Sequence, residues 1–461
     1  MKKRLIASHF LFLTTLGCLG QTTTAPKPSA SVRLVTLDPG HFHAALVQKS
    51  MYPNVDPRVH VYAPAGSDVQ LHLDRITAYN TRAEAPTRWQ EQVYTGPDFF
   101  QKMLSEKAGN VVVIAGNNQK KTEYIAGALK AGFNVLADKP MAINSKEFKT
   151  LETAFATAQQ KNLLLYDIMT ERFEITTVLQ KELSRLPQVF GTLEKGTPDN
   201  PAVTKESVHY FYKYVSGSVL TRPPWFMDVR QEGEGIVDVT THLVDLVQWE
   251  CFPERILDYK KDIQVLSAKR WTTDMSLGQF KTITKLNAFP DYLKHDLAND
   301  TLLKVYSNGS ISYKLLGVHA KVAVTWAYKA PEGAGDTHYS IMRGTKANLV
   351  IRQGAEQQYK TALYVEPIAN SPAYENALQN ELKKLQVKYP GLGLKKSAKG
   401  WEVLIPDSYR EGHEAHFARV TQQFLEYLEK HNMPKWEVPN MLAKYYTTTK
   451  ALELASQGAS E

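Results

Sequence analysis

The sequence has very little cysteine and no long apolar run. Only Cys18 and Cys251 occur among 461 residues, which excludes a disulfide-rich scaffold and a structural zinc site built from cysteine alone. After the signal-like start, no stretch approaches the roughly 18 uninterrupted apolar residues of a membrane-spanning helix. Hydrophobic residues make up 43% of the chain and charged residues 22%, which is ordinary globular composition. These values exclude wholesale disorder, a collagen-like chain and a coiled-coil rod.

Charge of one sign is not concentrated anywhere. The chain has 55 basic and 47 acidic residues, and its formal net charge of +8 includes Lys2, Lys3 and Arg4. Elsewhere, Lys and Arg form no run long enough to follow a nucleic-acid backbone. A mild basic excess of this kind is typical of a solvated surface, so we predict no nucleic-acid partner.

Residues 1–20 have the layout of a secretory signal segment. The basic start is followed by a short apolar stretch over Leu5–Leu16 and by small residues up to Gly20. We predict export to the periplasm, with cleavage near Gly20 or lipid attachment to Cys18, because the four residues ending there resemble a bacterial lipoprotein box. A lipid would tether the protein to a membrane without spanning it. Residues 21–31 have the composition of a linker.

Residues 32–166 alternate short β-type runs with longer helical patterns. This alternation predicts an α/β Rossmann-like dinucleotide-binding domain, in which helices cover both faces of a parallel sheet. Ligands of such sheets bind at the carboxyl ends of the strands. The expected strands cover residues 32–37, 59–62, 110–115, 134–137 and 163–166, and the expected helices begin at residue 44 and cover 122–131 and 145–160.

Residues 167–461 show longer strand patterns with alternating apolar residues. They predict an α+β domain with an open, mostly antiparallel sheet that has one covered face. We expect the other face to meet the first domain across a cleft. The expected strands cover residues 263–268, 280–286, 301–305, 320–327, 340–344 and 348–353.

The first strand-to-helix turn, residues 38–43, contains a single glycine. Gly40 stands where a phosphate-binding loop has its middle glycine, which lets the backbone approach a diphosphate. Asp38 puts a carboxylate near that position, and His43 adds bulk where helix packing normally needs a small residue. An ordinary tight turn is the alternative interpretation. The second strand ends at Ala63 without the usual ribose-binding acid, so both NAD and NADP stay open.

Three later segments carry motifs that belong together. Residues 113–118 (VIAGNN) precede a segment that ends in Asp-Lys-Pro at residues 138–140. Residues 171–173 are Glu-Arg-Phe, and residues 225–246 contain a glycine-rich turn followed by Asp-x-x-x-His. Together they resemble the fourth and fifth strands, the arginine-containing segment and the Asp-x-x-x-His motif of the Gfo/Idh/MocA oxidoreductases. The combination is specific, whereas each motif alone is not.

The resemblance covers residues 32–351 and two closing helices near the carboxyl end. The stretch from about 354 to 409 has no counterpart and is expected to be an insertion of an exported bacterial subgroup. The resemblance implies metal-free hydride chemistry with NAD or NADP, a small carbohydrate substrate and a homo-oligomer. The residues it assigns to the cofactor are Asp38, Gly40, His41, Phe42, Gly116, Asn117, Asp138 and Lys139, and those facing the substrate are Arg172, Trp225 and His242.

Lys139, Asp238 and His242 are the residue types that hydride transfer needs. Lys139 leaves a strand end directly before a proline, so its ammonium points into the crevice and can orient a substrate hydroxyl. Asp238 and His242 are four residues apart and would share one helix face, where the carboxylate orients the imidazole as general base. The alternatives are a surface lysine, a helix cap and a core histidine. Asp245 could also pair with His242.

Two histidine pairs invite a metal hypothesis, namely His41 with His43 and His413 with His416. Neither pair is accompanied by cysteine or by a convergent set of carboxylates. We therefore predict no metal, and expect His41 to line the cofactor crevice.

These observations support three functions. The first is an exported oxidoreductase of a sugar or glycoside hydroxyl that holds NAD(P) tightly, because no free nicotinamide pool can be assumed outside the cytoplasm. The second is a glycoside hydrolase that uses the same residues for transient oxidation and elimination. The third is a carbohydrate-binding protein on a decayed oxidoreductase fold, which Asp38, His43 and Ala63 favour and which Lys139, Asp238 and His242 oppose.

Overall fold

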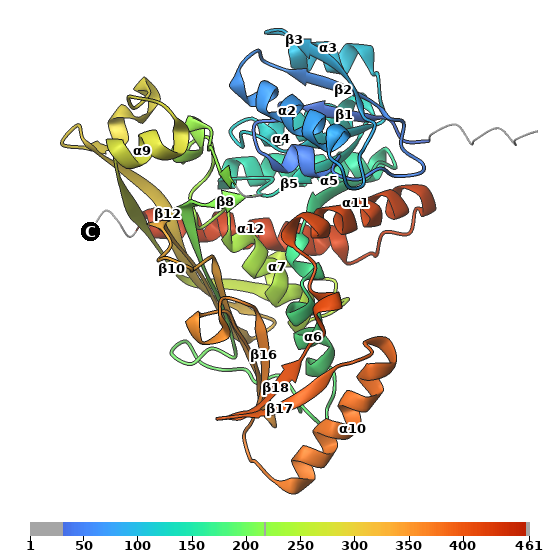
Figure 1. The fold of residues 1–461 in the computed structure, drawn as a ribbon, viewed down its shortest axis with the longest axis vertical. Helices are drawn as coiled ribbons and strands as arrows, with labels where there is room; N and C mark the ends of the chain where they lie inside the picture. The colour runs from blue at the N-terminus through green and yellow to red at the C-terminus, as the bar shows by residue number, and fades with distance from the viewer. Residues whose placement is uncertain (1–30, 216–217, 458–461) are drawn as a thin grey trace, which may run out of the picture.

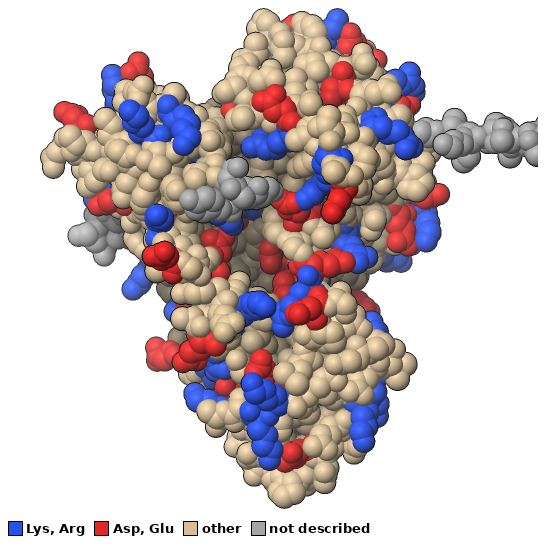
Figure 2. Space-filling model, viewed as in Figure 1, with Lys and Arg blue, Asp and Glu red and all other residues tan. Residues whose placement is uncertain are grey.

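The computed structural model describes residues 31–215 and 218–457 (Figure 1). The expected signal segment, the lipid attachment site at Cys18 and nearly all of the expected linker lie outside the described residues. None of the helices in the described part has both the length and the apolar character that crossing a bilayer requires. On the face shown in Figure 2, acidic and basic side chains are interspersed.

The first domain contains a six-stranded parallel sheet with the order β3-β2-β1-β4-β5-β6. This is the Rossmann strand order, and the predicted α/β class is confirmed. The edge strand β3 was missed by the periodicity because most of its side chains are exposed and polar. The strands are β1 (Leu34–Leu37), β2 (Arg58–Ala63), β3 (Gln90–Thr95), β4 (Val111–Ile114), β5 (Asn134–Asp138) and β6 (Leu165–Ile168).

Five helices connect these strands and cover the sheet (Figure 1). The apolar strands β1, β4, β5 and β6 are buried throughout, as expected for the interior of a parallel sheet. After β1 the chain continues to β2 and β3 on one side, and after β4 it continues to β5 and β6 on the other side. This reversal of the strand order opens a crevice at the carboxyl ends of β1 and β4. The helices are α1 (His43–Leu46), α2 (Ser67–Thr81), α3 (Phe99–Glu106), α4 (Lys121–Ala131) and α5 (Ser145–Gln160).

The second domain is built on a ten-stranded sheet with the order β10-β12-β13-β7-β14-β15-β16-β18-β17, and β11 pairs with β12. Strands β13 and β7 run parallel and the other pairs antiparallel, which confirms the predicted open, mostly antiparallel sheet. The strands are β7 (Val203–Tyr212), β10 (Ile263–Ser276), β11 (Leu297–Ala298), β12 (Leu302–Leu315), β13 (Val318–Lys329), β14 (Thr337–Arg343), β15 (Ala347–Arg352), β16 (Ala362–Pro367), β17 (Gly393–Ser397) and β18 (Gly400–Leu404); β8 (Tyr214–Val215) and β9 (Ser218–Val219) form a separate hairpin.

The strand expected over residues 280–286 is wrong, because this segment belongs to helix α9 (Leu277–Thr284). Ser276 and Gln279 form a capping box that starts the helix, and the buried residues Phe280 and Ile283 are three apart, which is helical spacing. The segment 354–409 extends the same sheet through β16, β18 and β17, and adds helix α10 (Pro372–Lys388).

The last helices return to the first domain, as Figure 1 shows. Helix α11 (His413–Lys430) contacts α1, β6 and the 3-10 helix η1 (Thr170–Phe173), while α12 (Glu437–Gln457) lies against α5, α7 (Thr240–Cys251) and β10. The remaining helices are α6 (Ile175–Ser184), α8 (Tyr259–Asp262), η2 (Pro224–Met227), η3 (Asp291–Asp296), η4 (Ala355–Gln357) and η5 (Asp407–Tyr409).

The segment that leads into α7 lies directly on strand β12. A Cβ atom on Gly235 would stand 1.8 Å from the carbonyl oxygen of Ser307, so only glycine allows this approach. The contact matters because Asp238 and His242 follow immediately along the chain.

We expect Gly235→Ala to lower the free energy of unfolding by at least about 2 kcal/mol, because the added methyl group forces the segment away from β12. Urea denaturation of the purified protein measures this change. The control is Gly335→Ala, where a Cβ would meet no heavy atom within 4 Å, and it should stay within about 0.5 kcal/mol of wild type. Equal stability of the two variants would contradict the described approach.

Candidate functional site

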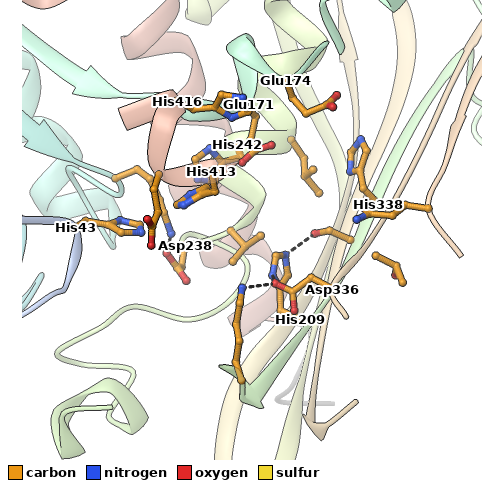
Figure 3. A pocket seen from close by; sticks show the side chains of 18 of the residues that line it. His43, Glu171, Glu174, His209, Asp238, His242, Asp336, His338, His413 and His416 are labelled. Atoms are coloured by element: carbon orange, nitrogen blue, oxygen red, sulfur yellow. Dashed lines mark hydrogen bonds and ion pairs between the residues drawn. The ribbon is translucent and has the colours of Figure 1, made fainter. Parts of the chain in front are cut away.

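A cavity of about 700 Å³ lies between the two domains. One wall contains the turn after β1, the residue that follows β5 and the start of α7, and the other contains β7 and the segment entering β14. Figure 3 shows Asp238 and His242 facing His209, Asp336 and His338 across this space. Its lining includes the histidines His41, His43, His209, His242, His338, His413 and His416.

Lys139 and Asp238 form a buried ion pair across the domains. The Lys139 ammonium donates to Asp238 Oδ1, and the two side chains are 12% and 7% exposed. Burial alone would lower the pKa of Lys139, but the charges of Asp238 and Asp138 outweigh it and raise this pKa above its ordinary value. Lys139 is therefore held as a cation at the cavity wall.

His242 lies in the first turn of α7 and lines the same cavity. Burial, followed by the nearby Lys139 charge, lowers its pKa well below the ordinary value, so its imidazole is neutral near pH 7. Its Nδ1 atom is buried without a hydrogen-bond partner among the described residues. The imidazole is thus available as a proton acceptor.

The expected bond between Asp238 and His242 is wrong. Helix α7 begins at Thr240, so Asp238 precedes the helix and does not stack below His242 on its face. Its carboxylate binds Lys139 instead. Asp245, the alternative partner of His242, binds Arg172 and Lys444.

Arg172 does not line the cavity, which corrects its expected role toward substrate. Its guanidinium donates to both carboxylate oxygens of Asp245 at 2.7 Å and to Glu437 at 3.0 and 3.1 Å. Burial by itself raises the pKa of Asp245, but Arg172 and Lys444 hold it well below its usual range. Arg172 therefore fixes α7 and α12 behind the site, and acts on the position of His242.

Trp225 was also expected to face the substrate, but it does not line the cavity. Its indole Nε1 donates to Asp68 Oδ2 at 2.7 Å, and its Cζ2 atom lies 2.9 Å from where a Gly40 Cβ would stand. The side chain thus crosses from the second domain and covers the turn after β1. The neighbouring Phe226 lines the cavity instead.

The turn after β1 is packed tightly against the end of β4. A Cβ on Gly116 would stand 2.1 Å from the carbonyl oxygen of Asp38, and the Asn117 side chain donates to Gln231 Oε1 at 2.6 Å. Asp38 accepts from the Tyr124 hydroxyl at 3.2 Å, and burial raises the pKa of this carboxyl to about 6.

Several amides of this turn are already paired within the protein. The amides of Gly40 and His41 donate to the carbonyl oxygens of Asp38 and Ala115, and the amide of His43 donates to His41 Nδ1 at 3.3 Å. The turn therefore offers fewer free donors than a glycine-rich phosphate loop does. His41 and Phe42 both line the cavity, with their ring centroids 4.6 Å apart.

The opposite wall holds a hydrogen-bonded group that the sequence analysis missed. His209 Nδ1 lies 3.2 Å from Asp336 Oδ2, its Nε2 lies 3.0 Å from Ser207 Oγ, and the Lys213 ammonium donates to Asp336 at 2.6 Å. Ser207 and His209 are two apart on β7, so their side chains share one face of the sheet. The sequence gives no clear signal for this strand, because the polar residues Lys205 and Ser207 stand at its buried positions and interrupt the apolar alternation.

The comparisons with known proteins agree with this fold. The family model described as "Oxidoreductase family, NAD-binding Rossmann fold" matches residues 62–166, and the one described as "Putative oxidoreductase C terminal domain" matches residues 179–456. No curated protein matches the chain.

Solved structures match over nearly the whole chain. A crystal structure described as "a putative oxidoreductase" from Parabacteroides merdae is 60% identical, covers 93% of this chain and 98% of its own, and has a TM-score of 0.91. Levoglucosan dehydrogenase in complex with NADH and levoglucosan is 12% identical, with coverages of 92% and 97% and a TM-score of 0.59. GenD2 from gentamicin A biosynthesis, in complex with NAD, is 15% identical, with coverages of 97% and 98% and a TM-score of 0.53.

The Lys139–Asp238 pair generates a prediction about pH. In Asp238→Asn the burial of Lys139 remains while its counter-charge is lost, so its pKa falls and more free amine is present at any given pH. For each unit by which the pKa of Lys139 falls, its labelling by an amine reagent at pH 8 should become about tenfold faster. Peptide mass spectrometry after competitive labelling measures the rate.

Asp336→Asn provides the control for this variant, because it removes the partner of Lys213 on the opposite wall. Lys139 should be labelled at the wild-type rate in this variant. Wild-type labelling of Lys139 in Asp238→Asn would show that the ion pair does not control the amine.

Proposed function

Because the chain belongs to the Gfo/Idh/MocA family of oxidoreductases, we propose that it transfers hydride between NAD(P) and a carbinol carbon of a sugar or glycoside. The observation that carries this proposal is the convergence of Lys139, Asp238 and His242 on one cavity between the domains.

The protein's own residues divide the work of this reaction. The Lys139 ammonium donates to the oxygen of the reacting hydroxyl and stabilises negative charge that develops there. Neutral His242 accepts the hydroxyl proton at a ring nitrogen during oxidation and returns it during reduction. Asp238 balances the charge of Lys139 and fixes its position. The nicotinamide cofactor, when bound, supplies the hydride acceptor or donor.

The residues at the crevice fit a dinucleotide at its nicotinamide end. The Rossmann strand order and the close approach of Gly116 to the turn place residues 38–43 at the β1–β4 crevice. Beside it, His242 lines a cavity large enough for a ring and a sugar, and its buried Nδ1 has no hydrogen-bond partner among the described residues. We assign cofactor binding to the following residues: Asp38, Gly40, His41, Phe42, Gly116, Asn117, Asp138 and Lys139. Since Ala63 ends β2, we assign no preference between NAD and NADP.

A carbohydrate suits the lining of the cavity. Side-chain donors and acceptors stand on both walls, so several hydroxyl groups can be bound at once. The levoglucosan dehydrogenase, which has the same fold, binds a sugar together with NADH.

The group formed by Ser207, His209 and Asp336 favours a second candidate function. A glycoside hydrolase that oxidises the sugar transiently needs further acid–base groups, because a carbon-bound proton must leave and the departing oxygen must be protonated. His209 lies on the wall opposite His242 and is oriented by Asp336. The net product separates the two functions, since a dehydrogenase yields a keto-sugar and a hydrolase yields free sugar without net redox change.

Loss of either acid–base residue should strongly reduce the rate of hydride transfer. We expect Lys139→Met and His242→Asn each to reduce kcat/KM for glycoside oxidation by about 10²- to 10⁴-fold. The absorbance of reduced nicotinamide, followed with a panel of sugars and glycosides, measures the rate. Lys146→Met, an exposed lysine on α5, serves as the control and should keep wild-type activity. Full activity of both site variants would refute the assigned roles.

We further propose that the protein is exported and keeps its cofactor through the catalytic cycle. The signal-like residues 1–20 support export, and Trp225, which covers the turn after β1, supports slow exchange. The full-length chain, expressed in a Gram-negative host, should be recovered from the periplasmic or membrane fraction with a mature end near Cys18 or Gly20. Denaturing the purified protein should release about one nicotinamide nucleotide per chain. Recovery with an intact leader in the cytoplasm would refute export, and an empty protein that binds neither nucleotide would refute the retained cofactor.

A further inference from the structure

Three potential metal ligands from two distant segments meet beside the cavity. His41 Nδ1, His43 Nδ1 and a carboxylate oxygen of Asp138 all lie within 4.8 Å of one another. His43 Nδ1 is 2.9 Å and His41 Nδ1 is 3.7 Å from Asp138 Oδ2. Ligands held tetrahedrally at about 2.1 Å from a zinc ion are about 3.4 Å apart. Shifts of about half an ångström would therefore bring these atoms to coordinating distance.

The donor atoms are directed into the cluster. His41 Nδ1 accepts the amide of His43 at 3.3 Å, so this nitrogen is unprotonated, and a metal ion would take its single lone pair from that long hydrogen bond. His43 Nδ1 is bonded to the carboxylate, and a metal ion would take the place of the shared proton. Both imidazoles border the cavity, so an open coordination position would face the substrate space.

The surrounding contacts leave one carboxylate oxygen for the histidines. Asp138 Oδ1 accepts the amide of Lys139 at 3.0 Å, while Oδ2 faces the two imidazoles. The Lys121 ammonium donates to the main-chain oxygen of Asp138, and the Lys139 ammonium donates to Asp238. The positive charges of Lys121 and Lys139 repel any metal cation. They disfavour a hard ion such as Mg²⁺, which oxygen ligands hold through charge, more than an ion that bonds strongly to imidazole nitrogen.

The neighbouring helix α11 supports the geometry of His43. The His413 ring lies 5.4 Å from the His43 ring, and the Phe417 ring lies 4.5 Å from it, measured between centroids. The two histidine pairs of the sequence thus approach each other in space. The sequence showed no convergent carboxylates for these histidine pairs. In the structure Asp138, which lies 95 residues after His43 in the chain, supplies one.

We propose that His41, His43 and Asp138 form a binding site for a divalent first-row transition ion of the Zn²⁺ class. The set of two imidazoles, one carboxylate and an open position is that of a catalytic rather than a structural zinc site. The open position would hold water or an oxygen of the carbohydrate. His41 and Asp138 are also assigned to the cofactor crevice, but binding of the ion requires neither nucleotide nor substrate and can be measured apart from hydride transfer.

The test uses the full mature chain after removal of metal and nucleotide. We expect Co²⁺ to bind with a stoichiometry of one and to show the intense visible bands of a four-coordinate site, and Zn²⁺ to displace it. Anomalous scattering from a Co²⁺-soaked crystal should give a peak between the three side chains. Absence of Co²⁺ binding, or an anomalous peak elsewhere, would overturn the proposal.

Variants locate the site in solution. His41→Ala and Asp138→Asn should each weaken Co²⁺ binding at least about tenfold. His209→Ala is the matched control, because this histidine also contacts an aspartate and lines the same cavity, and it should keep wild-type affinity. Unchanged binding in the first two variants, or loss in His209→Ala, would overturn the proposal. Circular dichroism checks folding, and the anomalous map of the wild-type protein decides if a variant fails to fold.

These results are separable from the proposed function. Metal binding is measured without turnover, so an inactive protein can still bind the ion. Conversely, a protein that transfers hydride at the full rate without binding Co²⁺ would refute the metal site alone.

Discussion

The buried ion pair between Lys139 and Asp238 is the interaction on which the site depends. Lys139 directly follows strand β5 of the first domain, and Asp238 precedes the helix of the second domain that carries His242. Both side chains are largely buried, at 12% and 7% exposure, and loss of one partner from a buried pair costs about 3–5 kcal/mol because the other charge is left without its counter-charge. The pair therefore joins the two domains at the lysine that we propose contacts the substrate.

A second ionic network behind α7 holds this arrangement in place. The Lys444 ammonium lies 2.7 Å from Asp167 and 2.8 Å from Asp245, and Arg172 joins Asp245 to Glu437. These residues come from the end of β6, from η1, from α7 and from α12. Each carboxylate has a cationic partner, so the network tolerates its burial and fixes the helix that presents His242.

The sequence is sufficient to predict the fold class and one part of the cavity wall, namely Lys139, Asp238 and His242 with the turn after β1. It is insufficient to predict the opposite wall or the partners of individual side chains. Strands such as β1 and β4 are short apolar runs, and their parallel pairing follows from the helices between them. Lys139 lies at the carboxyl-end edge of the parallel sheet, where ligands are expected, and α7 of the second domain brings His242 to the same cavity. By contrast, Asp238 binds Lys139 rather than His242 because α7 starts two residues later than the spacing suggests. Trp225 finds its partner Asp68 157 residues away, a distance that no local pattern encodes.

The position of Trp225 links the two domains to the fate of the cofactor. Its ring lies against Gly40, and its indole nitrogen is bonded to Asp68 in the first domain. A nucleotide that enters or leaves along this turn must displace a ring supplied by the other domain, and must break its hydrogen bond to Asp68. Three main-chain amides of this turn already donate hydrogen bonds within the protein. The turn therefore offers few free donors to a phosphate group. The cofactor retention that we propose would then depend on enclosure between the domains more than on a phosphate loop.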